Sequence, residues 1–245
     1  MNLYEMQNLH PPVPWNIRIV DETSSTNTDL LQQSLPHGTV LLARAQRAGK
    51  GSRGRSFFSP KGGIYLSLLL EDHPTEQLSM LTPMAAVAVL RALRPHTNKD
   101  LSIKWVNDIY LDGGKVCGIL TETRFCGAHH RTAVGVGINL LPPPKGFPDG
   151  FLHPPTALLT EASTHIAEEI INAFLKEMHS LLAKGEFLKE YKENCCTLGK
   201  RVTLARGDEI FTGRAVDILA DGALMIRTEE GKMISFASGE VTSQI

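Results

Sequence analysis

The sequence predicts an α+β protein in which a larger domain, residues 1–196, is followed by a small all-β domain, residues 197–245. Within the larger part, short apolar runs typical of strands are interleaved with long segments of helical periodicity. After Cys196 the apolar runs are short and separated by turn sequences, with no helical segment between them. The length of 245 residues fits one medium domain plus one small domain.

The elements are expected in the following order. Residues 1–14 contain three prolines and predict an extended arm. Strands of the larger domain are expected at 17–20, 39–45, 64–70, 101–105, 109–111, 116–122 and 132–139. Helices are expected after the polar run 21–27 and over 78–92, 166–182 and 186–194. Gly185 is expected to end the long helix that precedes it. Strands of the small domain are expected at 202–204, 210–218, 223–228 and 233–236.

Composition excludes several classes of protein. A net charge of -1 gives no overall field for a polyanion, so no nucleic acid partner is expected. No apolar run reaches the length of a membrane span, and the N-terminal residues lack the pattern of a signal peptide. The four cysteines form no C-x-x-C pair, which favours a reducing compartment. We therefore expect a soluble cytoplasmic protein in which no side chains ligate a metal.

A glycine-rich basic stretch, residues 46–60, is the most informative part of the sequence. Its glycines alternate with Lys50, Arg53 and Arg55, so the backbone can approach a ligand amid positive charge. The pattern is not a Walker loop, because no G-x-x-x-x-G-K-[ST] run is present. It indicates an anion site of another design, or a solvated hairpin loop whose cations only maintain solubility.

Three further motifs accompany this stretch. Lys104-Trp105-Val106-Asn107-Asp108 ends an apolar run and places a cation, an amide and a carboxylate at a strand end. Ser25-Thr26-Asn27 offers helix caps, or groups that bind a neutral polar ligand. Gly135 and Gly137 leave one face of a strand bare, which indicates a close approach of a ligand or another backbone, or a bulge.

Taken in this order and spacing, with residues 115–122 and the small C-terminal β domain, these motifs resemble the biotin protein ligases from about Val20 onward. The resemblance implies a central mixed sheet with packed helices, similar to the class II aminoacyl-tRNA synthetase catalytic fold, and a C-terminal SH3-like barrel. Because only the proline-rich arm precedes Val20, it implies the monofunctional type without an N-terminal DNA-binding domain.

The activity implied by the resemblance is ATP-dependent biotinylation of a specific lysine on a biotin carrier domain. The ligase would use biotin, ATP and Mg²⁺, pass through biotinyl-5'-AMP and form a C–N bond. The implied partner is the biotin carboxyl carrier domain of acetyl-CoA carboxylase or of a related carboxylase. Sheet-edge pairing in such folds also allows a homodimer.

The resemblance also assigns residues. Lys104, Arg53 and Arg55 are the implied catalytic groups, with Lys104 bridging the biotin carboxylate and the α-phosphate. The implied binding residues for biotin and ATP are Ser25, Thr26, Asn27, Gln46, Gly49, Lys50, Gly51, Ser52, Trp105, Asn107, Lys115, Gly118, Gly137 and Asn139. Fixed cations stabilise charge that develops at a phosphate most strongly where water is excluded, which is the physical reason for this set.

Two alternatives share the core fold, namely a lipoate or octanoate ligase or transferase, and a non-catalytic biotin-binding regulator. The Lys-Trp-x-Asn-Asp motif and the basic glycine-rich stretch favour biotin. The sequence departs from the family at Ser52, where an arginine is common. Serine lacks the guanidinium that could hold the loop or a phosphate, so this departure bears on how well the biotinyl-5'-AMP intermediate is retained.

Overall fold

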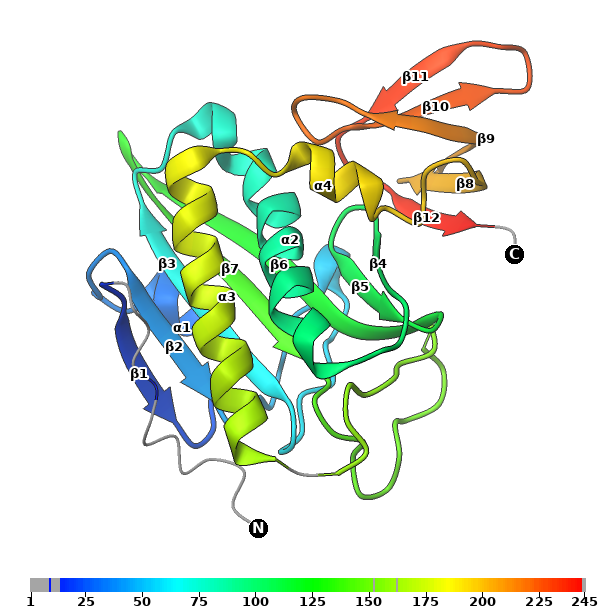
Figure 1. Ribbon diagram of the computed structural model, residues 1–245. Coiled ribbons are helices and arrows are strands. Elements are labelled where there is room, and N and C mark those ends of the chain that lie inside the picture. Colours follow the sequence, from blue (N-terminus) through cyan, green and yellow to red (C-terminus); the bar gives the residue numbers. More distant parts are fainter. Residues whose placement is uncertain (1–8, 10–13, 152, 162, 244–245) are drawn as a thin grey trace.

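The computed structural model describes residues 9, 14–151, 153–161 and 163–243, so the arm expected over residues 1–14 lies almost wholly outside the described residues. A seven-stranded sheet with helices on both faces forms the larger part, and a five-stranded antiparallel sheet follows it (Figure 1). The predicted α+β fold with a central mixed sheet is confirmed. The division into domains at residue 196 stays a prediction.

The large sheet has the strand order β1-β2-β3-β7-β6-β5-β4. Its strands are β1 (Asn16–Val20), β2 (Thr39–Ala43), β3 (Ile64–Glu71), β4 (Leu101–Lys104), β5 (Asp108–Leu111), β6 (Gly114–Cys126) and β7 (His129–Ile138). β1 and β2 are parallel and the other pairs are antiparallel, which makes the sheet mixed. The β3–β7 register pairs Ser67 with Gly135 and Tyr65 with Gly137, which aligns the two glycines with the sheet centre.

Two long helices cover one face of this sheet. They are α2 (Leu81–Leu93) and α3 (Thr164–Lys184), followed by the short α4 (Leu188–Glu193). Almost every residue of α2 is buried between the sheet and α3, and its alanines allow close packing. Ser163 accepts a hydrogen bond from the Ile166 N–H at the start of α3, and Gly185 ends it at a φ of 71°. The prediction for Gly185 is therefore confirmed.

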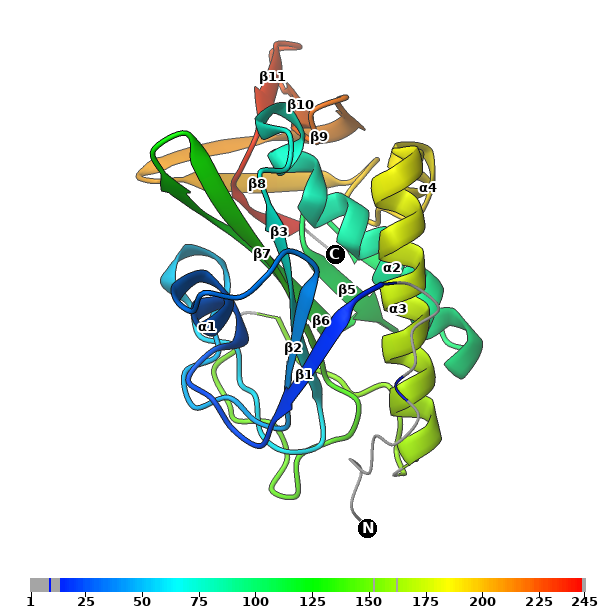
Figure 2. The same cartoon turned by 90° about the vertical axis from the view of Figure 1, so that its left-hand side faces the viewer.

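The opposite face carries α1 (Thr26–Gln32), as Figure 2 shows. This helix begins at Thr26, earlier than the apolar residues Leu30 and Leu31 on which its prediction rested. Leu30 packs with Leu41 and Leu69 in a small second core. The short 3-10 helices are η1 (Ser52–Gly54), η2 (Thr75–Met80) and η3 (Arg94–His96).

The C-terminal sheet has the order β11-β10-β9-β8-β12. Its strands are β8 (Arg201–Arg206), β9 (Glu209–Ile218), β10 (Leu224–Thr228), β11 (Met233–Phe236) and β12 (Glu240–Ser243). β12 was not predicted, and it pairs with β8 at one edge. Buried residues of this sheet, such as Leu204 and Phe236, belong to the same apolar cluster as α2 and α3. The two sheets are therefore joined by a continuous core.

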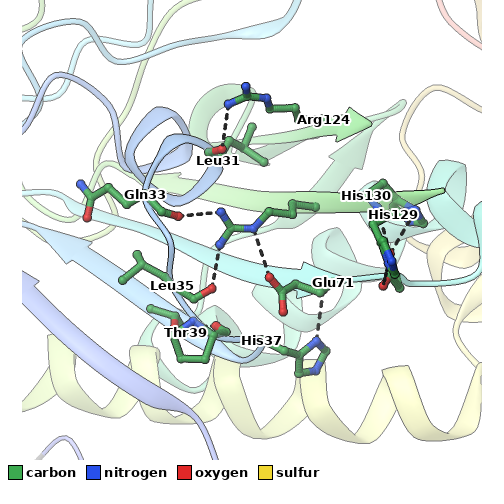
Figure 3. Close-up of polar contacts among 12 residues, drawn as sticks. Leu31, Gln33, Leu35, His37, Thr39, Glu71, Arg124, His129 and His130 are labelled. Atoms are coloured by element: carbon green, nitrogen blue, oxygen red, sulfur yellow. Dashed lines mark hydrogen bonds and ion pairs between the residues drawn. The ribbon is translucent and has the colours of Figure 1, made fainter. Parts of the chain in front are cut away.

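Contacts at the outer ends of β3, β6 and β7 hold α1 and the chain after it (Figure 3). Arg131 donates to the carbonyl oxygens of Gln33 and Leu35 and pairs with Glu71. These bonds satisfy carbonyl groups just beyond the end of α1 and tie this end of the helix to the sheet. None of the described helices is both long enough and apolar enough to cross a membrane.

Candidate active site

A cavity lies on the sheet face that carries α1. It is lined by residues from α1, the glycine-rich stretch and the central strands. The predicted residues among them are Ser25, Thr26, Asn27, Gln46, Lys50, Gly51, Ser52, Arg55, Asn107, Lys115, Gly118 and Gly137. A smaller aromatic cavity next to it is lined by Asn139 together with Phe57, Phe58, Phe147 and Phe151. Gly49 lines a wide hollow outside both. Three predicted residues are not among the described lining residues of the two cavities, namely Arg53, Lys104 and Trp105.

One end of the first cavity is a network of neutral polar groups. Gln46 Oε1 accepts hydrogen bonds from the Thr26 N–H at 2.9 Å and from the Thr26 hydroxyl at 3.1 Å. The Ser67 hydroxyl lies 2.6 Å from both Thr26 Oγ1 and Asn27 Oδ1. The Ser25 hydroxyl forms no capping bond with α1 and lines the cavity. Such fixed donors and acceptors suit a small neutral polar ligand group.

Asn27 is bound on every side. Its Nδ2 donates to the Leu120 carbonyl at 3.0 Å and to Glu122 Oε2 at 2.9 Å. Glu122 Oε1 also lies 3.4 Å from Lys50 Nζ, so one carboxylate joins α1 to the glycine-rich stretch. Neither Glu122 nor Ser67 was singled out from the sequence. The sequence signal for these two residues is weak, because each is only one polar residue within a predicted strand.

The structure explains why β7 has glycine at positions 135 and 137. A Cβ at Gly135 would lie 2.3 Å from Asn27 Oδ1, and a Cβ at Gly137 would lie 2.5 Å from the Phe57 ring. A Cβ at Gly118 would also meet this ring, at 2.9 Å. Side chains, rather than another backbone, thus lie close to the bare face of β7. The pairing of β7 with both neighbouring strands has no bulge. The glycines let Asn27 and Phe57 lie flat against the sheet.

The other end of the cavity is cationic, and each predicted cation contacts a protein partner. Lys115 Nζ lies 2.8 Å from Asp108 Oδ1. Arg55 Nη1 lies 2.7 Å from Glu240 Oε1, and Arg53 donates to the Ala205 carbonyl at 3.2 Å. Arg55 also donates to the Ser52 hydroxyl at 3.2 Å. Arg53 and Arg55 therefore link the glycine-rich stretch to the C-terminal sheet.

Lys104 lies at the end of β4 and contacts His153 Nε2. Its ammonium is also 5.8 Å from the centre of the Tyr110 ring. Burial lowers the pKa of Lys104 to about 8, while the nearby carboxylate of Asp108 opposes this shift. Burial also lowers the pKa of His153, and Lys104 adds to this effect. His153 was missed because it lies in an irregular segment with no local pattern.

Trp105 and Asn107 follow Lys104 and have different surroundings. Trp105 is buried, its backbone N–H donates to Thr197 Oγ1 at 3.0 Å, and its Nε1 donates to the Gly222 carbonyl at 2.9 Å. It thereby anchors the C-terminal sheet. Asn107 Nδ2 donates to the Ile119 carbonyl at 2.9 Å and remains at the cavity wall. Asn139 Nδ2 donates to the Lys115 carbonyl at 3.3 Å.

Among the described residues, no cluster of three or more His, Cys, Asp or Glu side chains could hold a metal ion. The arrangement is thus a polar pocket, a row of cations and an aromatic cavity side by side. It can bind a ligand that carries a neutral hydrogen-bonding group, a central anion and a flat ring.

Two family profiles match the chain. That of the biotin/lipoate A/B protein ligase family matches residues 17–139, and that of the biotin protein ligase C terminal domain matches residues 197–242. Together they cover the large sheet, most of the cavity lining and most of the C-terminal sheet, but not Phe151 and His153 of the lining.

Individual relatives agree with these profiles. The bifunctional ligase/repressor BirA of Bacillus subtilis is 30% identical over 223 residues, which is 87% of this chain and 69% of the relative. The biotin--[acetyl-CoA-carboxylase] ligase of Paracoccus denitrificans is 30% identical over 227 residues, covering 86% of this chain and 94% of the relative. The solved structure of biotin protein ligase from Aquifex aeolicus in complex with biotin and ATP matches with a TM-score of 0.76 at 28% identity. This match covers 94% of this chain and 98% of that chain.

Proposed function

Because the chain belongs to the biotin/lipoate A/B protein ligase family, we propose that it catalyses ATP-dependent biotinylation of a lysine on a biotin carrier domain. The observation that carries this proposal is the cavity in which the polar network around Thr26 and Gln46 continues into the cations Lys50, Arg55 and Lys115. Biotin has a neutral ureido ring at one end and a carboxylate at the other, so it matches both ends of this cavity.

The first step joins the biotin carboxylate to the α-phosphorus of ATP and releases pyrophosphate. We assign the ureido ring to Ser25, Thr26 and Gln46, whose hydroxyl and amide groups can donate and accept. Lys104 is assigned to the carboxylate and the α-phosphate, where negative charge grows in the transition state. Arg53, Arg55 and Lys115 are assigned to the phosphates. Mg²⁺ enters with ATP as part of the substrate.

The adenine base is assigned to the aromatic cavity beside Asn139. Phe57, Phe147 and Phe151 offer apolar ring faces there, and stacking on such faces contributes about 1–3 kcal/mol per base. Asn139 lies at the wall of this cavity, where its amide can reach a polar edge of the base. This assignment supports ATP as the activating substrate.

In the second step the carrier lysine attacks the acyl carbon of biotinyl-5'-AMP, forms an amide and releases AMP. We propose the carrier domain of acetyl-CoA carboxylase or of a related carboxylase as the acceptor. The mixed anhydride reacts with water, so the glycine-rich stretch has a second role in covering it. The free thiols Cys117, Cys126, Cys195 and Cys196 support a reducing compartment such as the cytoplasm.

The direct test is the intact mass of a purified biotin acceptor domain after incubation with this protein, MgATP and biotin. We expect a gain of one biotinyl group that requires ATP and the acceptor lysine. Lipoate and octanoate, tested in parallel on their own acceptor, distinguish the substrates. Modification with either of these and none with biotin would overturn the biotin assignment, and no modification at all would favour a binding protein.

A further inference from the structure

We infer that His153 is a positioning residue for Lys104, because its Nε2 accepts a hydrogen bond from the ammonium group and holds it beside the ligand cavity. The role in the reaction rests on the proposed function. The contact itself does not, and it can be tested separately.

The two residues reach one another from distant parts of the chain. Lys104 ends β4, whereas His153 is 49 residues further along, in the irregular segment between β7 and α3. The Tyr110 ring contacts both, with its centre 5.8 Å from Lys104 Nζ and 6.1 Å from the centre of the imidazole. Lys104 and His153 therefore both pack against the Tyr110 ring at the point where they contact each other.

His153 lies at the cavity wall, where Lys104 contacts it. It lines both the large cavity and the aromatic cavity, whereas the described linings do not include Lys104. An ammonium that points to Nε2 of His153 thus points toward the place where we assign the carboxylate and α-phosphate. Since an ammonium has three donors, two remain for anionic ligand oxygens while one is held by the imidazole.

The contact requires particular protonation states. An ammonium cannot accept a hydrogen bond, so Nε2 must be unprotonated and the imidazole neutral, with its proton on Nδ1. Burial and the charges of Lys104 and Lys115 lower the pKa of His153, while Asp108 and Glu240 oppose them. Near neutral pH the imidazole is therefore neutral and Lys104 is still charged. In acid the imidazole becomes a cation and repels Lys104.

Positioning matters here because a free lysine side chain has many rotamers, and ordering it in the transition state costs conformational entropy. A lysine already held by His153 and Tyr110 has lost part of this freedom before the ligand arrives. The expected effect of His153 is therefore on the rate of adenylation, kcat, more than on the KM for biotin.

The kinetic test compares His153→Gln, whose amide oxygen can still accept from Lys104, with His153→Phe, which keeps a ring but has no acceptor. Biotin-dependent pyrophosphate exchange is measured from acid to alkaline pH. We expect His153→Phe to lower kcat on the order of 10- to 100-fold, as a small misplacement of a reacting group does, and His153→Gln to stay near wild type. His153→Gln should also abolish the loss of activity in acid. Exposed His165 supplies the control His165→Gln.

The second test needs no activity. Nitrogen NMR of the His153 imidazole gives its tautomer and pKa in the wild-type protein and in Lys104→Met. We expect the Nδ1-protonated tautomer in the wild type and a higher pKa in the variant, because a neighbouring cation is removed. Equal pKa values, or wild-type kcat in His153→Phe, would overturn the inference. If the wild-type protein catalyses no exchange, the proposed function fails and the titration alone decides.

Discussion

Arg55 Nη1 lies 2.7 Å from Glu240 Oε1, which joins the glycine-rich stretch at the cavity to β12 at the edge of the C-terminal sheet. Arg53 adds a bond to the Ala205 carbonyl of β8 at 3.2 Å. The two guanidinium groups assigned to phosphates thus also bind the second sheet. The C-terminal sheet therefore participates in holding the loop over the cavity.

A double-mutant cycle tests this link. Arg55→Ala and Glu240→Ala should each lower the free energy of unfolding slightly, with a coupling of about 0.2–1 kcal/mol because the pair is partly exposed. Arg55→Ala should also raise the KM for ATP more than Glu240→Ala does, since only Arg55 is assigned to the phosphates. Urea unfolding and pyrophosphate exchange provide the measurements. Equal effects on the KM for ATP would restrict Arg55 to the contact with β12.

Lys104 is the cation assigned to the atoms that react. Replacing it by alanine removes a charge from a buried site at which negative charge develops, so adenylation should slow on the order of 10²- to 10³-fold. The rate is measured by biotin-dependent pyrophosphate exchange, with circular dichroism to confirm folding. An unchanged exchange rate in Lys104→Ala would remove this residue from the mechanism.

The pKa of Lys104, about 8, predicts an alkaline limit on the reaction. As pH rises through this value the free enzyme loses the ammonium, so kcat/KM for biotin should fall, because this ratio reports the free enzyme. The free energy of unfolding should rise over the pH range in which kcat/KM falls. Between pH 8 and the ordinary lysine pKa of 10.5, the unfolded chain binds more protons, and the free energy of unfolding rises with pH. Lys104→Arg is the control, because an arginine keeps its charge over this range and should abolish the alkaline limb.

Local periodicity explains how much of the fold the sequence could predict. The spacing of apolar residues over 166–182 and the glycine at 185 predict α3 and its end closely. β12 was missed because Val241 is its only large apolar residue, and its burial depends on pairing with β8 some forty residues earlier in the chain. A strand with one large apolar residue therefore carries little local signal.

The same distinction holds for the candidate site. The cations of residues 50–55 are evident from the sequence, but the partner of Arg55 lies 185 residues away. Gly135 and Gly137 predict a bare strand face, yet nothing local shows that Asn27 and Phe57 fill it. His153 and Glu122 were missed for this reason too, since each acts through a residue brought near by the tertiary fold.

Gly135 provides a test of how the polar pocket is built. In Gly135→Ala the new Cβ would lie 2.3 Å from Asn27 Oδ1, so Asn27 must move and the network through Ser67 and Glu122 is disturbed. We expect a loss of about 1–3 kcal/mol in stability from overpacking, together with weaker biotin binding. Calorimetric unfolding and isothermal titration measure the two effects. Adding Asn27→Ala should relieve the overlap and recover part of the stability but not the binding, and normal binding by Gly135→Ala would contradict the assignment.

Ser52 tests retention of the intermediate. Its hydroxyl accepts a hydrogen bond from Arg55 at 3.2 Å, and its carbonyl accepts a second from Arg55 Nε at 3.3 Å, so a short polar side chain supports this guanidinium at the cavity rim. An arginine at this position would add a cation that can reach the phosphate of biotinyl-5'-AMP. We therefore expect Ser52→Arg to release the adenylate more slowly. Release is followed by trapping dissociated biotinyl-5'-AMP after a single turnover without acceptor, with Ser52→Gln as a control for side-chain size. Equal release rates for the wild-type protein and the Ser52→Arg variant would mean that the adenylate is retained by the cavity and not by charge at this position.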